Sequence, residues 1–305
     1  MSLAVLCPGQ GGQHAGMFDL IASVAEGEAA LRRAGDLVGF DLRGEGDRIF
    51  DNAVAQPTLC AVALATWSLL APRLAAAGIA PACFAGYSVG ELAAHGCAGA
   101  LSFDDTIVLA QVRARAMDAA STDGDGLVAV RGLALAQVDA LVALHGGHVA
   151  IVNGEDQVLV GGSRLALDAL VADVARRHGQ TQRLPVRVAS HTPSLARAVE
   201  PFRARLAAVT WRGASAPVLA GIDGSKVSDA PTAIDVLARQ VATTIRWSAC
   251  MDAVRERGTT VCLELGPGRA LSRMMQERHR DIASRSIEDF RSIDGVVEWV
   301  VRASA

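Results

Sequence analysis

Aromatic and charged residues are both scarce in this chain. Aromatics make up 4% of its 305 residues and charged residues 20%, against 51% hydrophobic residues. A core with so few rings must be built from Ala, Val and Leu, which suits helices packed closely on a sheet. The net charge is −3 and no run of basic residues occurs, so nothing in the sequence points to nucleic acid as a partner. The length allows one large domain or two unequal ones.

Paired cysteines, a basic leader and a membrane-length apolar run are also missing. Residues 1–8 contain no basic residue and too short an apolar run for a signal peptide. The longest nearly apolar stretch, residues 59–72, lies in a buried helix predicted over 57–74 with Pro57 at its start, and it is shorter than the ~20 residues of a membrane span. The cysteines are scattered without Cys-x-x-Cys or metal-type histidine spacing, so we expect buried thiols, no metal and a cytoplasmic protein that binds no membrane. They are Cys7, Cys60, Cys83, Cys97, Cys250 and Cys262.

A glycine-rich loop follows the first predicted strand. The strand is the apolar run Leu3–Cys7, and the loop covers residues 9–13. The loop does not fit a dinucleotide-binding fingerprint, because His14 stands where the third glycine belongs. It can instead present free backbone N–H groups to an anion, and a plain turn is an equally good interpretation of this segment alone.

The most informative stretch is Gly-Tyr-Ser-Val-Gly-Glu at residues 86–91. An apolar run, residues 79–85, leads into it, and an Ala-rich helical pattern follows at once. This layout is typical of a nucleophile elbow, a strand-to-helix turn that holds Ser88 in a strained conformation at the amino end of a helix. Gly86 and Gly90 are expected where neighbouring backbone passes too close for a Cβ atom. The alternative is a serine in an ordinary turn, since the chain contains 30 glycines.

A change of pattern marks a second, smaller domain. Residues 121–126 form the clearest linker, and beyond it the pattern predicts the order β-α-β-β-α-β, the ferredoxin-like signature. We therefore expect an α/β protein in which a ferredoxin-like domain, residues 123–190, is inserted into a larger domain of residues 1–122 and 191–305. The predicted strands of the insert are 127–131, 148–152, 157–161 and 181–188, and its helices are 135–145 and 163–178.

Two arginines lie in the mainly apolar helix predicted for residues 106–120. Arg115 can be satisfied on its own helix by Gln111 and Asp118. Arg113 cannot, because the residues three and four positions away from it are all apolar. A guanidinium on an apolar face is costly unless an anion meets it, and its planar fork matches a carboxylate. That anion is either an internal Asp or Glu or, in the functional interpretation, a carboxylate of the substrate.

A serine nucleophile requires a base and donors for the developing oxyanion. His191 is the candidate base, because it lies in a loop where the chain re-enters the larger domain, although a lone histidine is more often a surface or core residue. The candidate donors are the backbone N–H groups of Val89, directly after Ser88, and of Gln10 in the glycine loop. Together with Arg113 these groups describe acyl transfer on an acyl group that carries a free carboxylate.

Five motifs then occur in one order along the chain. They are Pro-Gly-Gln-Gly at 8–11, Gly-Tyr-Ser-Val-Gly-Glu at 86–91, Gln-Val-Arg-Ala-Arg-Ala-Met at 111–117, Ser-His at 190–191 and Glu-Leu-Gly-Pro-Gly at 264–268. The set resembles the malonyl-CoA:acyl-carrier-protein transacylase family over nearly the whole chain. The resemblance implies an α/β-hydrolase-like larger domain with a ferredoxin-like insert and no bound cofactor. It also implies a malonyl-CoA thioester as substrate and the phosphopantetheine-type arm of an acyl carrier protein as acceptor.

The same resemblance assigns a role to each candidate residue. It implies that Ser88 takes malonyl from CoA by a ping-pong route, that His191 is its base, and that Arg113 binds the malonyl carboxylate. The groups implied to hold and orient the reacting atoms are the backbone N–H groups of Gln10 and Val89, as oxyanion hole, and the backbone carbonyl of Gln240, as acceptor for the histidine.

Two departures from the family pattern favour one branch of it. Tyr87 precedes the serine where members of fatty-acid synthesis usually carry His, and residues 241–247 lack the usual Asn-Pro. The chain is in this respect similar to the transacylase (epsilon) subunit of malonate decarboxylase, which loads a small acyl-carrier subunit and assembles with other subunits. The alternatives are a malonyl transferase of fatty-acid or polyketide synthesis, a serine thioesterase or esterase, and a non-catalytic scaffold that docks a carrier.

Overall fold

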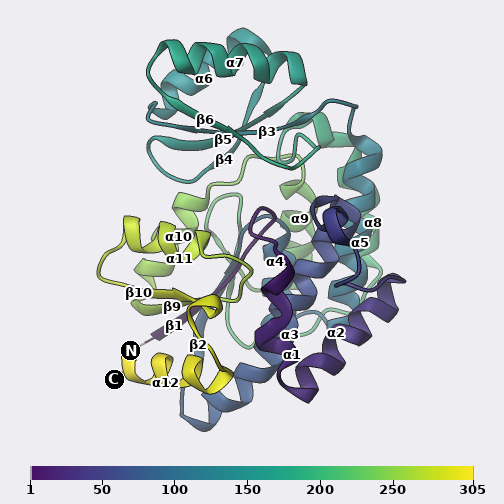
Figure 1. The fold of residues 1–305 in the computed structure, drawn as a ribbon, viewed down its shortest axis with the longest axis vertical. Coiled ribbons are helices and arrows are strands. Elements are labelled where there is room, and N and C mark those ends of the chain that lie inside the picture. Colours follow the sequence, from purple (N-terminus) through teal and green to yellow (C-terminus); the bar gives the residue numbers. More distant parts are fainter. Residues whose placement is uncertain (1, 305) are drawn as a thin grey trace.

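The computed structural model describes residues 2–304 as two sheets and their covering helices (Figure 1). The strands are β1 (Ser2–Cys7), β2 (Pro81–Gly86), β3 (Gly126–Arg131), β4 (His148–Val152), β5 (Gln157–Gly162), β6 (Gln180–Arg183), β7 (Val218–Leu219), β8 (Lys226–Val227), β9 (Thr259–Glu264) and β10 (Ala283–Ser286). The helices are α1 (Asp19–Ala22), α2 (Ala25–Val38), α3 (Asn52–Ala76), α4 (Val89–Cys97), α5 (Phe103–Ala120), α6 (Leu135–His145), α7 (Arg164–Arg176), α8 (Ala196–Ala207), α9 (Ala230–Gln240), α10 (Trp247–Glu256), α11 (Ala270–Arg278) and α12 (Ile293–Ala303). Short 3₁₀ turns are η1 (Ala15–Phe18), η2 (Gly46–Phe50), η3 (Pro193–Leu195) and η4 (Ile287–Asp289).

The larger sheet is mainly parallel, which confirms the predicted fold class. Its six strands follow the order β10-β9-β1-β2-β7-β8; β7 and β8 pair antiparallel, and the other neighbours pair parallel. Leu3–Cys7 of the central strand β1 are all fully buried, as expected of a continuous apolar run between helical layers. Because β1 and β2 are parallel neighbours, their carboxyl ends lie side by side at one edge of the sheet. In open α/β sheets, ligands bind at this edge.

The second sheet has four strands in the order β4-β5-β3-β6, and all its neighbouring strands are antiparallel. Its elements follow the chain order β3-α6-β4-β5-α7-β6, and α6 and α7 cover the face turned away from the larger sheet (Figure 1). The last strand ends at Arg183 rather than at residue 188, because Pro185 has no N–H to continue the ladder. These elements fall inside residues 123–190, and the division into two domains remains a prediction.

Helix α3 begins earlier than the sequence pattern predicts. It starts at Asn52, where the N–H groups of Val54 and Ala55 donate to the carbonyl of Asp51, so the predicted start at Pro57 is wrong. With 25 residues it is also long and apolar enough to cross a membrane by length and composition, contrary to the expectation from residues 59–72. Most of its apolar window is nevertheless buried in the protein, where α3 packs against α2, α4, α5 and α12.

Edge strand β4 is joined to the larger part of the molecule by the segment between α9 and α10. The N–H of Val152 donates to the carbonyl of Ile245, and the N–H of Ile245 donates to the carbonyl of Ala150. The hydroxyl of Thr244 donates to the carbonyl of Val149 at 2.7 Å. Residues 240–247 therefore run between the two sheets.

The cysteines are buried, as predicted, and their thiols are free. No group of three or more His, Cys, Asp or Glu side chains that could hold a metal ion occurs between residues 2 and 304.

Candidate active site

The predicted elbow is present between β2 and α4. Ser88 has φ 57° and ψ −120°, a strained backbone conformation for a residue with a side chain. A Cβ on Gly86 would lie 2.0 Å from the carbonyl carbon of Gly90, and one on Gly90 would lie 2.1 Å from the carbonyl oxygen of Cys7. Only glycine fits at both positions, so the strands and the helix can close around Ser88 as the motif predicts.

His191 lies against Ser88 although it is 103 residues away in the sequence. Its Nε2 is 2.8 Å from Ser88 Oγ, and its Nδ1 is 2.7 Å from the carbonyl oxygen of Gln240. A carbonyl only accepts, so Nδ1 carries the hydrogen and Nε2 is free to accept the serine hydroxyl proton. Burial, and then the positive charge of Arg113, lower the pKa of His191 to about 3 against the opposing effect of the Gln240 carbonyl. The imidazole is therefore neutral at physiological pH.

Arg113 on α5 contacts the same serine. Its side chain is fully buried, Nη1 donates to Gln56 Oε1 at 2.8 Å, and Nη2 donates to Gln240 Oε1 at 2.9 Å and to Ser88 Oγ at 3.3 Å. Burial lowers its pKa to about 10, so the guanidinium stays charged at neutral pH. No carboxylate lies within ion-pair distance of it among the described residues. The sequence analysis allows an internal Asp or Glu or a substrate carboxylate as the anion that meets Arg113. The structure excludes the internal acid as a direct partner.

The glycine loop after β1 lies directly beside the elbow. A Cβ on Gly9 would lie 2.6 Å from the carbonyl oxygen of Tyr87 and 3.4 Å from the Ser88 Cβ. The next residue is Gln10, the predicted oxyanion donor. Val89 is the first residue of α4, where backbone N–H groups have no acceptor within the helix. Both predicted donors therefore border the serine.

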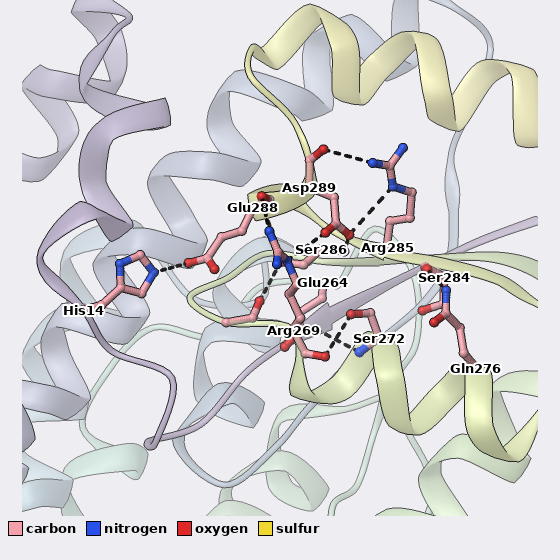
Figure 2. A network of polar contacts seen from close by, with 11 residues as sticks. His14, Glu264, Arg269, Ser272, Gln276, Ser284, Arg285, Ser286, Glu288 and Asp289 are labelled. Carbon is pink, nitrogen blue, oxygen red and sulfur yellow. Dashed lines mark hydrogen bonds and ion pairs between the residues drawn. The ribbon is translucent and has the colours of Figure 1, made fainter.

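His14, directly after the glycine loop, joins a polar network with residues of the C-terminal part of the chain (Figure 2). His14 Nε2 lies 2.6 Å from Glu288 Oε1, and a Cβ on Gly12 would lie 2.7 Å from the carbonyl oxygen of Pro267. The motif at residues 264–268 thus packs on the loop that carries Gln10. Its first residue, Glu264, accepts the N–H groups of Leu271 and Ser272 at the start of α11.

Arg115 does not make the contacts that its helical neighbours suggest. Its side chain is exposed, the amide of Gln111 donates to the carbonyl of Val38, and Asp118 accepts from Asn52. Both expected partners are used by residues of other elements, so the predicted pairing on α5 is wrong and water solvates Arg115.

Three polar groups of the site had no role assigned from the sequence. Glu91 is fully buried, and its Oε2 accepts from the N–H of Gly221 at 2.8 Å and from Gln240 Nε2 at 2.6 Å. The Gln240 side chain joins Glu91 to Arg113, and Gln56 is the second amide on that arginine. A signal existed for Gln56, a polar residue within an apolar helix, but the predicted helix start at Pro57 left it outside.

A half-buried serine in contact with a buried imidazole and a buried guanidinium, at the carboxyl edge of a parallel sheet, can carry out acyl transfer. The chain belongs to the acyl transferase family, because the family model described as "Acyl transferase domain" matches residues 5–293. The protein is therefore an acyltransferase.

Individual relatives and solved structures resemble the chain over nearly its full length. The chain is 32% identical over 308 residues to the malonyl CoA-acyl carrier protein transacylase of Mycobacterium bovis, covering 96% of this chain and 98% of that protein. It matches the crystal structure of MCAT from Mycobacterium tuberculosis at 30% identity with a TM-score of 0.90, over 97% of this chain and 100% of that one. It also matches a malonyl-transacylase solved with a type II PKS acyl-carrier protein, PlMCAT:AntF, at 25% identity and a TM-score of 0.91, over 98% and 99% of the two chains.

Proposed function

We propose that this protein transfers a malonyl group from CoA to the thiol of an acyl carrier protein through an ester on Ser88. The observation that carries the proposal is the position of Arg113 Nη2, 3.3 Å from Ser88 Oγ, beside a serine that also contacts His191. The names of the relatives support the same substrate and acceptor.

In the first half-reaction Ser88 Oγ attacks the thioester carbonyl of malonyl-CoA and its proton passes to His191 Nε2. The N–H groups of Gln10 and Val89 stabilise the oxyanion of the tetrahedral intermediate. As the intermediate collapses, the C–S bond breaks and the CoA sulfur takes the proton from His191. The products of this step are malonyl-Ser88 and free CoA.

In the second half-reaction the carrier thiol gives its proton to His191 and attacks the ester carbonyl. The same two N–H groups stabilise the second oxyanion, and the C–O bond to Ser88 then breaks. Ser88 Oγ recovers a proton from His191, so the enzyme returns to its starting state. A neutral imidazole, as the low pKa of His191 provides, is the form that accepts a proton in each half-reaction.

The short acyl chain explains why an arginine next to the serine suits malonyl. The free carboxylate of a malonyl ester is separated from the ester carbonyl by a single methylene, so its cation must lie beside the nucleophile. Arg113 lies there, and its direct partners are neutral, so its charge is available to a carboxylate.

The proposal is tested by incubating the full chain with radiolabelled malonyl-CoA and mapping the labelled residue by mass spectrometry. We expect one malonyl ester on Ser88, no ester in Ser88→Ala, and release of the label when a carrier thiol is added. Label that leaves equally fast without a carrier would identify a thioesterase instead. A site that takes up neither malonyl nor a fluorophosphonate probe would leave only the non-catalytic scaffold.

We further propose that the carrier is the acyl-carrier subunit of a malonate decarboxylase. Tyr87 before the serine and the missing Asn-Pro after Gln240 support this choice. The test compares malonyl transfer to that subunit and to the carrier of fatty-acid synthesis, each in its thiol form. A kcat/KM that favours the fatty-acid carrier would contradict the decarboxylase role and leave the malonyl transfer itself intact.

A further inference from the structure

Gln240 contacts more of the site than any function assigned to it requires. Its backbone carbonyl accepts from His191 Nδ1, and its side-chain Oε1 accepts from Arg113 Nη2. Its Nε2 donates to Glu91 Oε2 at 2.6 Å and to the carbonyl oxygen of Ser88 at 3.2 Å. One residue therefore links the base, the guanidinium and the backbone of the nucleophile.

The orientation of that amide follows from its neighbours. A guanidinium has donors only, so the atom facing Arg113 must be the amide oxygen. A carboxylate and a carbonyl have acceptors only, so the atom facing Glu91 and Ser88 must be the nitrogen, and both of its hydrogens are used. Glu91 accepts the shorter of the two contacts of the nitrogen, 2.6 Å against 3.2 Å, so an apolar group at residue 91 would leave the nitrogen held by the Ser88 carbonyl alone.

Glu91 is itself held from the other side. The N–H of Gly221 donates to the same Oε2 at 2.8 Å, and a Cβ on Gly221 would lie only 2.7 Å from that oxygen. Glu91 lies in the first turn of α4, directly after the elbow, and it is fully buried. Its carboxylate therefore has one fixed place between the backbone of residue 221 and the amide of Gln240.

The interposed amide also decides how much of the arginine's charge remains for a ligand. A direct Glu91–Arg113 ion pair would neutralise the guanidinium and occupy its donors. Because Gln240 lies between them, Glu91 stabilises the charge of Arg113 without a direct contact. The side chains that accept hydrogen bonds from Arg113 are neutral.

We propose that Glu91 is a positioning residue for substrate selection: it orients the Gln240 amide, which in turn aims Arg113 at the free carboxylate of the acyl group. The inference rests on the proposed malonyl transfer for its kinetic readout. Glu91 touches none of the reacting atoms.

The test compares Glu91→Leu, which removes the acceptor, with Glu91→Gln, whose amide oxygen can still accept from Gly221 and Gln240. The measurement is acylation of Ser88 by malonyl-CoA and by acetyl-CoA in the full chain. We expect Glu91→Leu to lower the malonyl-to-acetyl ratio of kcat/KM about tenfold through a raised KM for malonyl-CoA, and Glu91→Gln to restore most of that ratio. An unchanged ratio in folded Glu91→Leu overturns the inference.

A control and a second variant keep the result interpretable. Glu264→Leu removes an equally buried glutamate without a contact to Gln240, so it should lower the melting temperature and leave the ratio unchanged. If Glu91→Leu does not fold, Glu91→Asp keeps the charge but shortens the side chain by one methylene. A lowered ratio in it supports the inference, and a wild-type ratio overturns it.

A structural arm separates this inference from the proposed function. A crystal structure of Glu91→Leu, or of Glu91→Asp, should show the Gln240 amide turned away from Arg113. An unchanged amide contradicts the positioning role even if malonyl transfer is established. Failure of the wild-type enzyme to form a malonyl ester contradicts the proposed function, while the crystal structure still decides the role of Glu91.

Discussion

Glu91 at the start of α4 and Glu264 at the end of β9 are both fully buried, and burial raises the pKa of each to about 7. Each accepts two hydrogen bonds, but the donors differ. Glu264 accepts the N–H groups of Leu271 and Ser272, so its contacts end in the backbone of α11 (Figure 2). Glu91 accepts one backbone N–H and one side-chain amide, and that amide leads on to the site.

Burial and pKa alone therefore do not separate a structural acid from one that serves the site. What separates them is where the hydrogen-bonded partners lead. Glu264 satisfies N–H groups that every helix start leaves without a partner, which fixes α11 and the loop before it. Glu91 instead accepts from the buried side-chain amide of Gln240, which contacts Arg113. Loss of the first should cost stability, and loss of the second should cost selectivity.

The largest effect is expected at Arg113, to which Glu91 is connected through the side chain of Gln240. Arg113→Ala should reduce kcat/KM for malonyl-CoA by about 30-fold to several thousand-fold, since truncating one partner of a buried charged pair costs about 2–5 kcal/mol. Acetyl-CoA, which has no carboxylate, should lose much less. Steady-state acylation of Ser88 with both thioesters measures the difference.

Arg269→Ala is the matched control for that variant. Arg269 belongs to the Glu264 region, where it is exposed and pairs with Asp289 at 2.7 Å. We expect no change in the malonyl-to-acetyl ratio from its loss. If Arg113→Ala lost activity equally with the two thioesters, Arg113 would not bind the carboxylate. The Glu91 and Glu264 regions would then not differ in their effect on the malonyl-to-acetyl ratio.

The contrast between these regions shows what the sequence can predict. Arg113 was found from the sequence because the residues around it on its helix are apolar, which is a local property. The sequence shows Glu91 only as the last residue of the Gly-Tyr-Ser-Val-Gly-Glu motif and does not predict its role. Its partner Gln240 is 149 residues away, and a glutamate in the first turn of a helix is ordinarily solvated. A contact between residues so far apart in the sequence depends on how the helices and loops pack at the carboxyl edge of the larger sheet.

Element types were predicted better than their ends. Helix α6 and strand β4 lie where the periodicity places them, at residues 135–145 and 148–152. Strand β7 covers only two residues, Val218–Leu219, of the mainly apolar run at residues 216–222, because the chain turns there and the N–H of Ala220 donates to the carbonyl of Ser225. A two-residue strand is defined by its neighbours in the sheet, and hydrophobic pattern alone does not carry that information.

A moderate effect is expected at Glu264, and it should be on stability. Glu264→Ala should lower the free energy of unfolding by about 1–3 kcal/mol, because two buried N–H groups lose their acceptors. Its malonyl-to-acetyl ratio should stay at the wild-type value. Chemical denaturation with circular dichroism measures the first quantity, and a shifted ratio in this variant would mean that both glutamates act on the site.

The same residue predicts a dependence of stability on pH. The folded-state pKa of Glu264, about 7, lies above its usual value of 4.5, so the folded protein binds more protons between those values. The contribution of Glu264 to stability is therefore full below about pH 4.5 and falls as pH rises to about 7. Glu264→Gln lacks this loss, so wild type should lose stability relative to it between pH 5 and pH 8. A constant difference between the two proteins over that range would contradict the raised pKa.

The smallest effect is expected at Tyr87. This residue adjoins Ser88 in the sequence but is not part of the hydrogen bonds that connect Glu91 through Gln240 to Arg113. Its hydroxyl donates to Asn153 Oδ1 at 3.1 Å, and its ring meets Trp247 edge-on at 5.4 Å between centroids. Tyr87→Phe keeps the ring contact and loses one neutral hydrogen bond, so the free energy of unfolding should fall by about 0.5–1.5 kcal/mol.

Asn153→Ala completes the comparison for Tyr87. It leaves the hydroxyl of the half-buried Tyr87 without its acceptor, so it should cost about as much as Tyr87→Phe, and the double variant should cost less than the sum of the two. Neither change should alter the malonyl-to-acetyl ratio, because Tyr87 fixes the hairpin of the second sheet to the elbow and does not orient Gln240. A ratio that changed with Tyr87→Phe would show that nearness to Ser88, rather than a connection to Gln240, determines which residues affect selectivity.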